Sequence, residues 1–391
     1  MGRFSRCTQM SSVLKYQKIK GFQRISTRYH CEQKAETPLI SIAEVKRFIY
    51  DCMSAVGTPE DYANQMAEIL SEADYRGHFS HGMNRLEMYI NQIETGLCNP
   101  KACPSILKDF GATAWVDGKN ALGVVVGNYC NNLAIEKAKQ FGVGCVSAKG
   151  SNHYGICGKY AMDAINQGFI QFNCSNTSPL SVPTRANISF FGTNPFALGA
   201  PALCCDSFVL DMATTTAAVG KIEFAVRKGA KIPETWALNA EGKPETDPKK
   251  AMETTKLSPL GGPEFMGGYK GSGLIFMVEV LSGILSGSNY GPYIERWGKL
   301  TKPANLGHCF IVINPECFAP GFQERMTDIL KKLRCLSPVE SDKPVKAAGD
   351  VERDHMKLVD EAGGVRYVKN QMDTCEKLSK KFGVSALGSK C

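Results

Sequence analysis

The middle of the chain alternates between strand and helix signals, and this alternation sets the fold class. The apolar run Val143–Ser147 predicts a short buried strand, residues 159–165 predict a helix, and residues 169–174 predict another strand. Between the first strand and the helix lies the loop Gly150-Ser-Asn-His-Tyr-Gly155. α/β proteins place reacting groups in such loops, because the sheet fixes the loop while its polar groups stay accessible. We therefore predict an α/β fold with His153 in a strand-to-helix loop.

An imidazole in this position is a candidate acid or base. The ordinary pKa of histidine is about 6.5, so a small change of environment lets the ring exchange a proton near neutral pH. The alternative is that His153 is a turn residue bonded to the backbone. The loop alone leaves both interpretations open.

Local periodicity and turn residues predict the remaining elements. The run from Leu274 to Leu285 is apolar nearly all round, which is typical of a fully buried helix. Ser41 with Glu44 three residues later indicates a capped helix start, and folded structure is expected from about Pro38. We expect further strands at 113–117, 196–200, 208–210 and 308–314, and further helices at 128–140, 221–229, 320–333 and from 351 to about 383.

The N-terminal segment differs in composition from the rest of the chain. Residues 1 to 31 contain seven lysines and arginines and no acidic residue, whereas the formal net charge of the whole chain is +8. Residues 1–37 are therefore expected to be a mitochondrial transit peptide, which places the protein in the matrix; the alternative is a disordered basic tail on a cytoplasmic protein. The remainder is close to neutral, which gives no indication of nucleic-acid binding. No apolar run is long enough for a membrane span.

The sixteen cysteines are scattered, with no Cys-x-x-Cys pair and no zinc-ligand spacing. We expect them to be reduced, and no metal site is predicted. A metal-dependent hydrolase using His81, His153 and nearby acids is the first rival interpretation, because His78 lies three residues before His81. Gly77 and Gly82 bracket that pair, and no acid or cysteine beside it completes a ligand set.

The segment Ser80–Tyr89 is a second candidate for function. If it is helical, His81, Arg85 and Tyr89 lie one turn apart on a single face. An imidazole, a guanidinium and a phenol in one row could bind a carboxylate, since arginine contacts both carboxylate oxygens at once. The other interpretation is a solvated helix face.

Two polar regions could hold a phosphate-bearing ligand. Residues 175 to 220 are rich in Ser, Thr, Asn, Gly and Pro, whose hydroxyls and backbone N–H groups suit a polar ligand. Residues 267–273 form a glycine loop with Lys270 at the start of a helix, where free N–H groups and the helix dipole add to the lysine charge. The loop is not a Walker A sequence, and no G-x-G-x-x-G fingerprint occurs, so an ordinary Rossmann site is not supported.

Taken together, the motifs resemble the malate/L-lactate/ureidoglycolate dehydrogenase family, which are non-Rossmann NAD(P)-dependent 2-hydroxyacid oxidoreductases. The likeness covers about residues 40 to 385. It rests on Ala73-Asp-Tyr-Arg-Gly77, Ser80-His-Gly82 with Arg85, Asp117-Gly118, the 150–155 loop, Phe191-Gly-Thr-Asn-Pro195, Phe208-Val-Leu-Asp-Met-Ala-Thr214, Ile232-Pro-Glu-Thr-Trp-Ala237, Gly268-Tyr-Lys-Gly271 and Leu281-Ser-Gly-Ile-Leu-Ser-Gly287.

This resemblance implies a homodimer that oxidises small 2-hydroxy acids or reduces 2-keto acids with NAD or NADP, NAD being favoured. It implies a non-Rossmann central mixed-sheet cofactor domain at 113–253 and a mostly helical domain built from both chain ends, 38–112 and 254–391. The rivals within the same fold are a reductase of a diketo acid or a cyclic imine and a catalytically silent, cofactor-binding member.

The resemblance also implies residue roles. His153 matches the acid/base histidine, and His81 matches a second histidine that could donate the proton. The substrate is expected at Arg85, Tyr89 and Ser80. The positions that match cofactor contacts are Thr177, Asp211, Met212, Ala213, Lys270 and Gly271, and more weakly Gly349, Asp350 and Val351.

The chain departs from the family pattern at two positions. Ala304 stands where some ureidoglycolate-type members carry an arginine, which counts against a ureido-acid substrate. Ala348 stands where a proline is usual before Gly349, which weakens the C-terminal cofactor contact.

Overall fold

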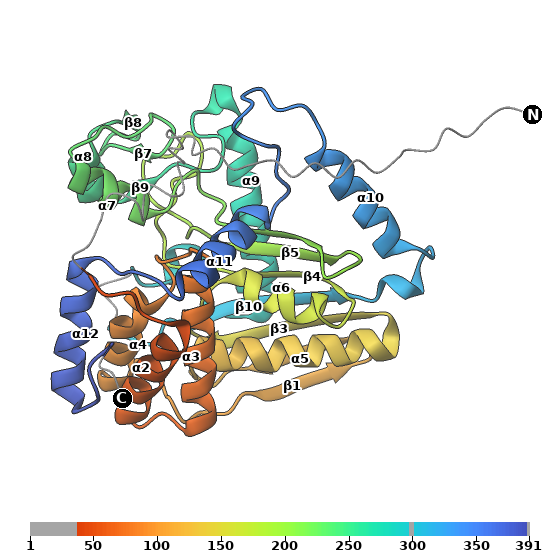
Figure 1. Ribbon diagram of the computed structural model, residues 1–391, viewed down its shortest axis with the longest axis horizontal. Coiled ribbons are helices and arrows are strands. Elements are labelled where there is room, and N and C mark those ends of the chain that lie inside the picture. Colours follow the sequence, from red (N-terminus) through yellow and green to blue (C-terminus); the bar gives the residue numbers. More distant parts are fainter. Residues whose placement is uncertain (1–36, 297–300, 389–391) are drawn as a thin grey trace, which may run out of the picture.

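A computed structural model describes residues 37–296 and 301–388 of the chain (Figure 1). The segment expected to be a transit peptide, 1–37, lies outside the described residues except for Thr37. Within the described part, no helix has the length and hydropathy needed to cross a bilayer.

The centre of the molecule is a seven-stranded mixed sheet, as predicted, with strand order β1-β2-β3-β10-β4-β5-β6. Only β2 and β3 are parallel neighbours; all other pairs are antiparallel. The strands are β1 (Ser105–Phe110), β2 (Thr113–Asp117), β3 (Val143–Ser151), β4 (Ile170–Ser175), β5 (Phe196–Pro201), β6 (Ser207–Met212) and β10 (Leu306–Ile313).

The sheet takes strands from outside the range 113–253. Strand β1 precedes that range, and β10 comes from the C-terminal half and inserts between β3 and β4. The edge strand β1 has no counterpart among the predicted strands, because five of its six residues are exposed and give no buried alternation.

Helices cover both faces of the sheet. Alternate side chains of β10 point to opposite faces: Phe310 and Val312 join the main core beneath α5 (Gly123–Phe141) and α6 (Cys157–Ile165). Cys309 and Ile311 pack instead with Val278 and Leu281 of α9 (Gly268–Glu279) and the π-helical turn η3 (Val280–Ile284).

The two ends of the described chain meet in one helical layer. Helices α2 (Ile42–Ala55), α3 (Glu60–Tyr75) and α4 (Leu86–Glu94) pack beside α11 (Asp350–Ala362) and α12 (Lys369–Phe382) (Figure 1). A β-bridge between Ile40 and Val365 joins the two ends directly, with hydrogen bonds of 2.9 and 2.8 Å. Ser41 caps α2 as predicted, because its Oγ accepts the Glu44 N–H.

A small peripheral unit and one further helix complete the described structure. The unit contains α7 (Val219–Lys228), α8 (Pro248–Thr254) and a three-stranded sheet in the order β8-β7-β9. The further helix, α10, packs near β5 and β6. The remaining bounds are β7 (Ala237–Leu238), β8 (Pro244–Glu245), β9 (Lys256–Leu257), α10 (Phe322–Arg334), and the short turns η1 (Met83–Arg85), η2 (Glu264–Met266), η4 (Gly291–Tyr293) and η5 (Pro315–Cys317).

The prediction of a fully buried helix at 274–285 is wrong for the single chain. One side of α9 and η3 packs on the sheet, but Phe276, Val280 and Ile284 are 50, 43 and 48% exposed. An all-round apolar sequence cannot distinguish burial inside one chain from burial against another surface.

The hairpin between β5 and β6 contains an unfavourable backbone conformation that a substitution should relieve. Its two central turn residues, Cys204 and Cys205, both have positive φ, +58° and +60°. This is the signature of a type I′ turn, which favours Asn-Gly. The double substitution Cys204→Asn/Cys205→Gly should therefore raise the free energy of unfolding by about 1 kcal/mol, measured by urea denaturation.

The matched control is Cys204→Ser/Cys205→Ser, which removes both thiols but keeps the unfavourable conformations. If the Asn-Gly variant is no more stable than the Ser-Ser variant, the turn is not strained in this way.

Candidate active site

The His153 loop is anchored where β3 ends. Gly150 adopts φ +66°, and a Cβ there would lie 2.8 Å from Asp117 Oδ1, so glycine is required. The Gly150 N–H donates to Asn305 Oδ1 (2.9 Å), and its carbonyl accepts the Asn120 N–H (2.7 Å). These contacts hold the loop against segments that come from two other parts of the chain.

The Ser80–Arg85 segment is a turn and not part of an α-helix. Residues 83–85 form one 3₁₀ turn, and α4 begins only at Leu86. The cause is Asp74 on α3, whose Oδ2 accepts the Met83 N–H (2.9 Å) and the Tyr367 hydroxyl (2.7 Å). A Cβ at Gly82 would lie 1.8 Å from Asp74 Oδ1, so the turn passes directly over this carboxyl.

Asp74 is completely buried, and burial raises its pKa to about 7. Sequence reasoning misses both Asp74 and Tyr367 as site residues. Asp74 lies inside the Ala73–Gly77 motif, which is a usable signal. Tyr367 has none, because it is 293 positions away from Asp74 along the chain.

The turn brings the predicted residues to the His153 loop. The imidazoles of His81 and His153 stack with centroids 5.8 Å apart and an interplanar angle of 22°. The Tyr89 hydroxyl hydrogen-bonds His153 Nδ1 at 2.5 Å. Ser80 Oγ contacts His81 Nδ1 at 2.8 Å, and Arg85 Nε donates to the Ser80 carbonyl at 2.7 Å. We call these five residues the histidine cluster.

Desolvation governs the charges in the histidine cluster. Burial, reinforced by the Arg85 charge, lowers the pKa of His81 to about 4. Burial, with His81 and Arg85 nearby, lowers the pKa of His153 well below its ordinary value. Burial also lowers the pKa of the Arg85 guanidinium, which Tyr89 partly offsets. Near pH 7 both imidazoles are therefore neutral beside a guanidinium that keeps its charge.

The positions expected to contact a cofactor form a contiguous chain of loops at the C-terminal ends of β4 and β6. Thr177 Oγ1 accepts the Thr193 N–H (2.9 Å), and the Thr193 carbonyl accepts the Thr214 N–H (2.9 Å). Thr214 directly follows Asp211, Met212 and Ala213. Its carbonyl accepts the Leu260 N–H (2.9 Å), and the Leu260 backbone packs against Gly271.

Asp211 links this region to the His153 loop. Its Oδ2 accepts the Gly158 N–H at the start of α6 (2.7 Å), so the carboxylate caps the helix that follows His153. Lys270 lies exposed in the first turn of α9, where the helix dipole adds to its positive charge. An exposed ammonium at a helix N-terminus beside threonine-rich loops suits the phosphates of a dinucleotide.

The C-terminal positions Gly349, Asp350 and Val351 lie at the start of α11. The preceding Ala348 carbonyl accepts the Val209 N–H (3.1 Å), so this turn runs along the outer edge of β6. The Asp350 carboxylate is already engaged by Arg334 and Arg353, at 2.9 and 2.6 Å. The Asp350 carboxylate thus forms ion pairs with both arginines, and Gly349 and Val351 lie on either side of it in the sequence.

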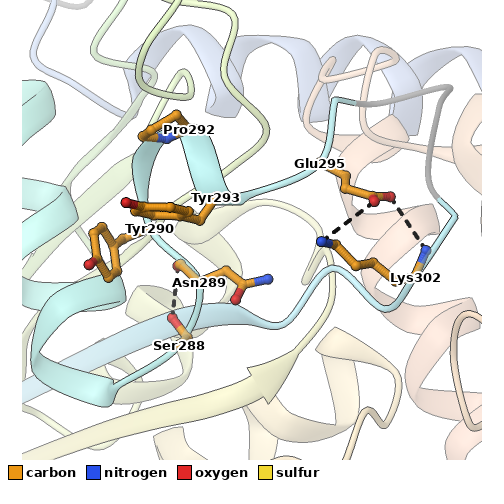
Figure 2. A pocket seen from close by; sticks show the side chains of 7 residues that line it. All are labelled: Ser288, Asn289, Tyr290, Pro292, Tyr293, Glu295 and Lys302. Atoms are coloured by element: carbon orange, nitrogen blue, oxygen red, sulfur yellow. Dashed lines mark hydrogen bonds and ion pairs between the residues drawn. The ribbon is translucent and has the colours of Figure 1, made fainter.

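A surface pocket of about 480 Å³ shares no lining residue with the histidine cluster and contains none of the predicted residues (Figure 2). Tyr290 and Tyr293 line one side, and Glu295 and Lys302 line the other. The Cβ of Tyr290 lies close to Gly283, so the pocket adjoins η3. Within the residues that the structure covers, no three His, Cys, Asp or Glu side chains are grouped to hold a metal ion.

Comparison with known proteins identifies the family of this chain. A sequence model of the malate/L-lactate dehydrogenase family matches residues 40–376. The chain belongs to the malate/L-lactate dehydrogenase family. It is therefore an NAD(P)-dependent oxidoreductase acting on CH–OH groups, in a family whose members act on 2-hydroxy acids.

Individual relatives show how broad the family is. The chain is 41% identical over 290 residues to a malate dehydrogenase of Pyrococcus horikoshii, covering 73% of this chain and 80% of that one. It is 36% identical over 342 residues to an L-sulfolactate dehydrogenase of Methanocaldococcus jannaschii, covering 87% and 96%. The crystal structure of a malate dehydrogenase from Entamoeba histolytica superposes with a TM-score of 0.85 at 33% identity, covering 90% and 99%.

The position that departs from ureidoglycolate-type members of this family is apolar in its surroundings. Ala304 is buried with Ile294 and Leu306 in a small cluster. These apolar surroundings suit the methyl side chain of Ala304.

The lowered pKa of His81 makes stability depend on pH in a defined direction. Below the ordinary histidine pKa of 6.5, the unfolded chain binds a proton that folded His81 accepts only near pH 4. Its contribution to folding is thus lost progressively as the pH falls from 6.5 to 4, by up to about 1.4 kcal/mol per pH unit. In urea unfolding across this range, His81→Gln should give a shallower dependence of stability on pH than the unaltered protein.

If the free energy of unfolding depends on pH with the same slope in both proteins, the pKa of His81 is not lowered in the folded state. The comparison cancels the contributions of carboxyl groups such as Asp74, since these are present in both proteins.

Proposed function

We propose that this enzyme interconverts a small, malate- or lactate-like 2-hydroxy acid and its 2-keto acid. The observation that supports this function is the histidine cluster: two neutral imidazoles stacked 5.8 Å apart beside a charged guanidinium. Oxidation of a secondary alcohol needs a group that removes the hydroxyl proton, and a 2-hydroxy acid also needs a cation for its carboxylate.

Each residue of the histidine cluster has a role in this reaction. Arg85 binds the substrate carboxylate through its guanidinium, and the Arg85 Nε–Ser80 bond keeps that group aimed at the site. His153 exchanges the hydroxyl proton. Its Nδ1 is engaged by the Tyr89 hydroxyl at 2.5 Å. With the ring hydrogen on Nδ1 and donated to the Tyr89 oxygen, Nε2 is the basic nitrogen that takes up the substrate proton. His81 is the second candidate for proton exchange, and its Nδ1 is engaged by Ser80.

The polar loops hold the nicotinamide cofactor. Lys270 and Gly271 would face its phosphates, and Thr177 with Asp211, Met212 and Ala213 would line the path toward the His153 loop. Gly349 and Val351 would contact it from the edge of β6. When bound, the nicotinamide supplies the hydride acceptor for alcohol oxidation. Rates measured with NAD and with NADP distinguish the two cofactors directly.

A substrate panel with active-site variants tests the function. The unaltered protein should oxidise at least one 2-hydroxy acid with NAD or NADP. His153→Ala should abolish turnover while cofactor affinity, measured by NADH fluorescence, stays nearly unchanged. Arg85→Lys should raise KM for the acid by about 10- to 100-fold with a smaller change in kcat, because a point charge replaces a two-pronged contact.

Glu87→Gln, an exposed change on α4, is the matched control and should leave both constants unaltered. If His81→Ala abolishes turnover while His153→Ala is mild, the two histidine roles are reversed. Reduction of a cyclic imine or diketo acid in preference to every simple keto acid would overturn the substrate assignment.

The exposed apolar side of α9 and η3 supports a homodimer. Phe276, Val280 and Ile284 follow one another along a continuous helix, and Tyr290 and Tyr293 extend the apolar surface. A run of this size is unusual on the surface of a monomer. A second copy is the proposed occupant, because the resemblance to the family implies self-association.

Replacing one residue of this surface should dissociate the dimer. Ile284→Glu should shift the mass measured by light scattering toward that of one chain, because burying a carboxylate without a partner is strongly unfavourable. Phe110→Glu changes a 77% exposed apolar residue elsewhere and should leave the mass unaltered. A monomeric unaltered protein, or dimers that persist in Ile284→Glu, would contradict this interface.

A further inference from the structure

His308 lies at the centre of the sheet, and none of the roles above uses it. It is on β10 and completely buried, although histidine is a polar residue. Its Nε2 contacts Ser151 Oγ at 2.7 Å, and its Nδ1 contacts Ser175 Oγ at 2.9 Å. One imidazole therefore joins the two strands that flank β10.

The two serines occupy equivalent places in the sheet. Ser151 is the last residue of β3, and Ser175 is the last residue of β4. The chain leaves β3 into the loop that contains His153 and leaves β4 into the loop that contains Thr177. The His308 ring thus connects the loop with the proposed proton-exchanging group to a loop proposed to contact the cofactor.

The hydrogen-bond partners assign the proton on the His308 ring. Ser175 Oγ donates its own hydrogen to the Asn176 carbonyl at 3.0 Å, so it accepts a hydrogen from His308 Nδ1. A neutral imidazole with its proton on Nδ1 accepts at Nε2. Ser151 Oγ donates there at 2.7 Å in preference to the Asn152 carbonyl, which is 3.5 Å away. Burial lowers the pKa of His308 to about 3, so this neutral form persists over the working pH range.

The face of the same ring supports the residue next to His153. Tyr154 stacks on His308 with centroids 4.4 Å apart and an interplanar angle of 4°. The Tyr154 hydroxyl donates to Asn173 Oδ1 on β4 at 3.1 Å, and its carbonyl accepts the Tyr160 hydroxyl at 2.6 Å. His308 therefore restrains the His153 loop through an edge contact and a face contact.

We propose that His308 is a positioning residue that sets the distance between the His153 imidazole and the cofactor loop at Thr177. The two ring nitrogens have separate roles, since Nε2 fixes the loop after β3 and Nδ1 fixes the loop after β4. The proposal rests on the proposed function only in the chemistry assigned to these two loops. Positioning errors of about 1 Å are enough to lower the rate of a reaction by up to 100-fold.

Four variants separate the two contacts. An asparagine amide reaches the position of Nδ1, and a glutamine amide reaches the position of Nε2. His308→Asn and Ser151→Ala should lower kcat by about 10-fold with nearly unchanged cofactor affinity, since they release mainly the His153 loop. His308→Gln and Ser175→Ala should weaken cofactor binding by a similar factor. At saturating cofactor, kcat should change much less in Ser175→Ala, whereas His308→Gln should also lower kcat because it removes the ring that stacks on Tyr154.

Ser147→Ala is the matched control. Ser147 is also a buried serine on β3, but the hydrogen bond that its Oγ makes within the described residues is a long one, to the His308 carbonyl at 3.5 Å. It should leave both kcat and cofactor affinity unchanged. Urea unfolding of every variant identifies any that fails to fold.

Hydrogen exchange measured by mass spectrometry provides a readout that does not depend on the substrate. Exchange should accelerate in residues 150–156 for Ser151→Ala and in residues 175–178 for Ser175→Ala. The proposal is overturned if exchange in both segments is unaltered, or if all four variants lower kcat and cofactor affinity together. If hydrogen exchange accelerates selectively in these two segments but the unaltered protein oxidises no hydroxy acid, the proposed function is contradicted and the positioning role of His308 stands.

Discussion

The hydrogen bond between the Tyr89 hydroxyl and His153 Nδ1 joins the two halves of the molecule at the candidate site. Tyr89 belongs to α4 in the helical layer, and His153 follows β3 of the central sheet. Together with the contact between the His81 and His153 rings, this hydrogen bond holds the turn that carries His81 and Arg85 against the loop that carries His153. Tyr89 is almost completely buried, so the contact forms where water cannot compete for it.

Burial has opposite consequences for the imidazoles and for the guanidinium near this contact. It keeps the imidazoles of His81 and His153 neutral, which prepares them to accept a proton. The same burial disfavours the Arg85 charge, which Tyr89 and Glu223 partly offset. Under the proposed function, a substrate carboxylate adds to this stabilisation by pairing with the guanidinium. The proposed function thereby links proton exchange at the imidazoles to recognition of an acid by Arg85.

Local sequence patterns predict the central strands well and the site turn poorly. The strand predicted at 169–174 is β4 (Ile170–Ser175), because a buried strand shows its apolar residues within a short stretch of sequence. The Ser80–Arg85 turn depends on Asp74 and on Tyr367, which is almost three hundred residues away, so helical spacing alone suggests the wrong conformation. The proximity of His81 and His153 follows from family resemblance and not from periodicity. The bridging position of His308 depends on β10 lying between β3 and β4. No local sequence motif predicts this long-range arrangement.

Under the proposed function, His81, His153 and Arg85 form one desolvated site that a substrate carboxylate completes. The most direct measurement is an NMR titration of the two imidazoles in histidine-labelled protein, with and without a non-reactive 2-keto acid analogue and bound cofactor. Both rings should remain neutral at pH 6.5, and the analogue should perturb both signals together, an effect that Arg85→Lys weakens. Two imidazoles that titrate near pH 6.5 independently, with no response to the analogue, would contradict the account.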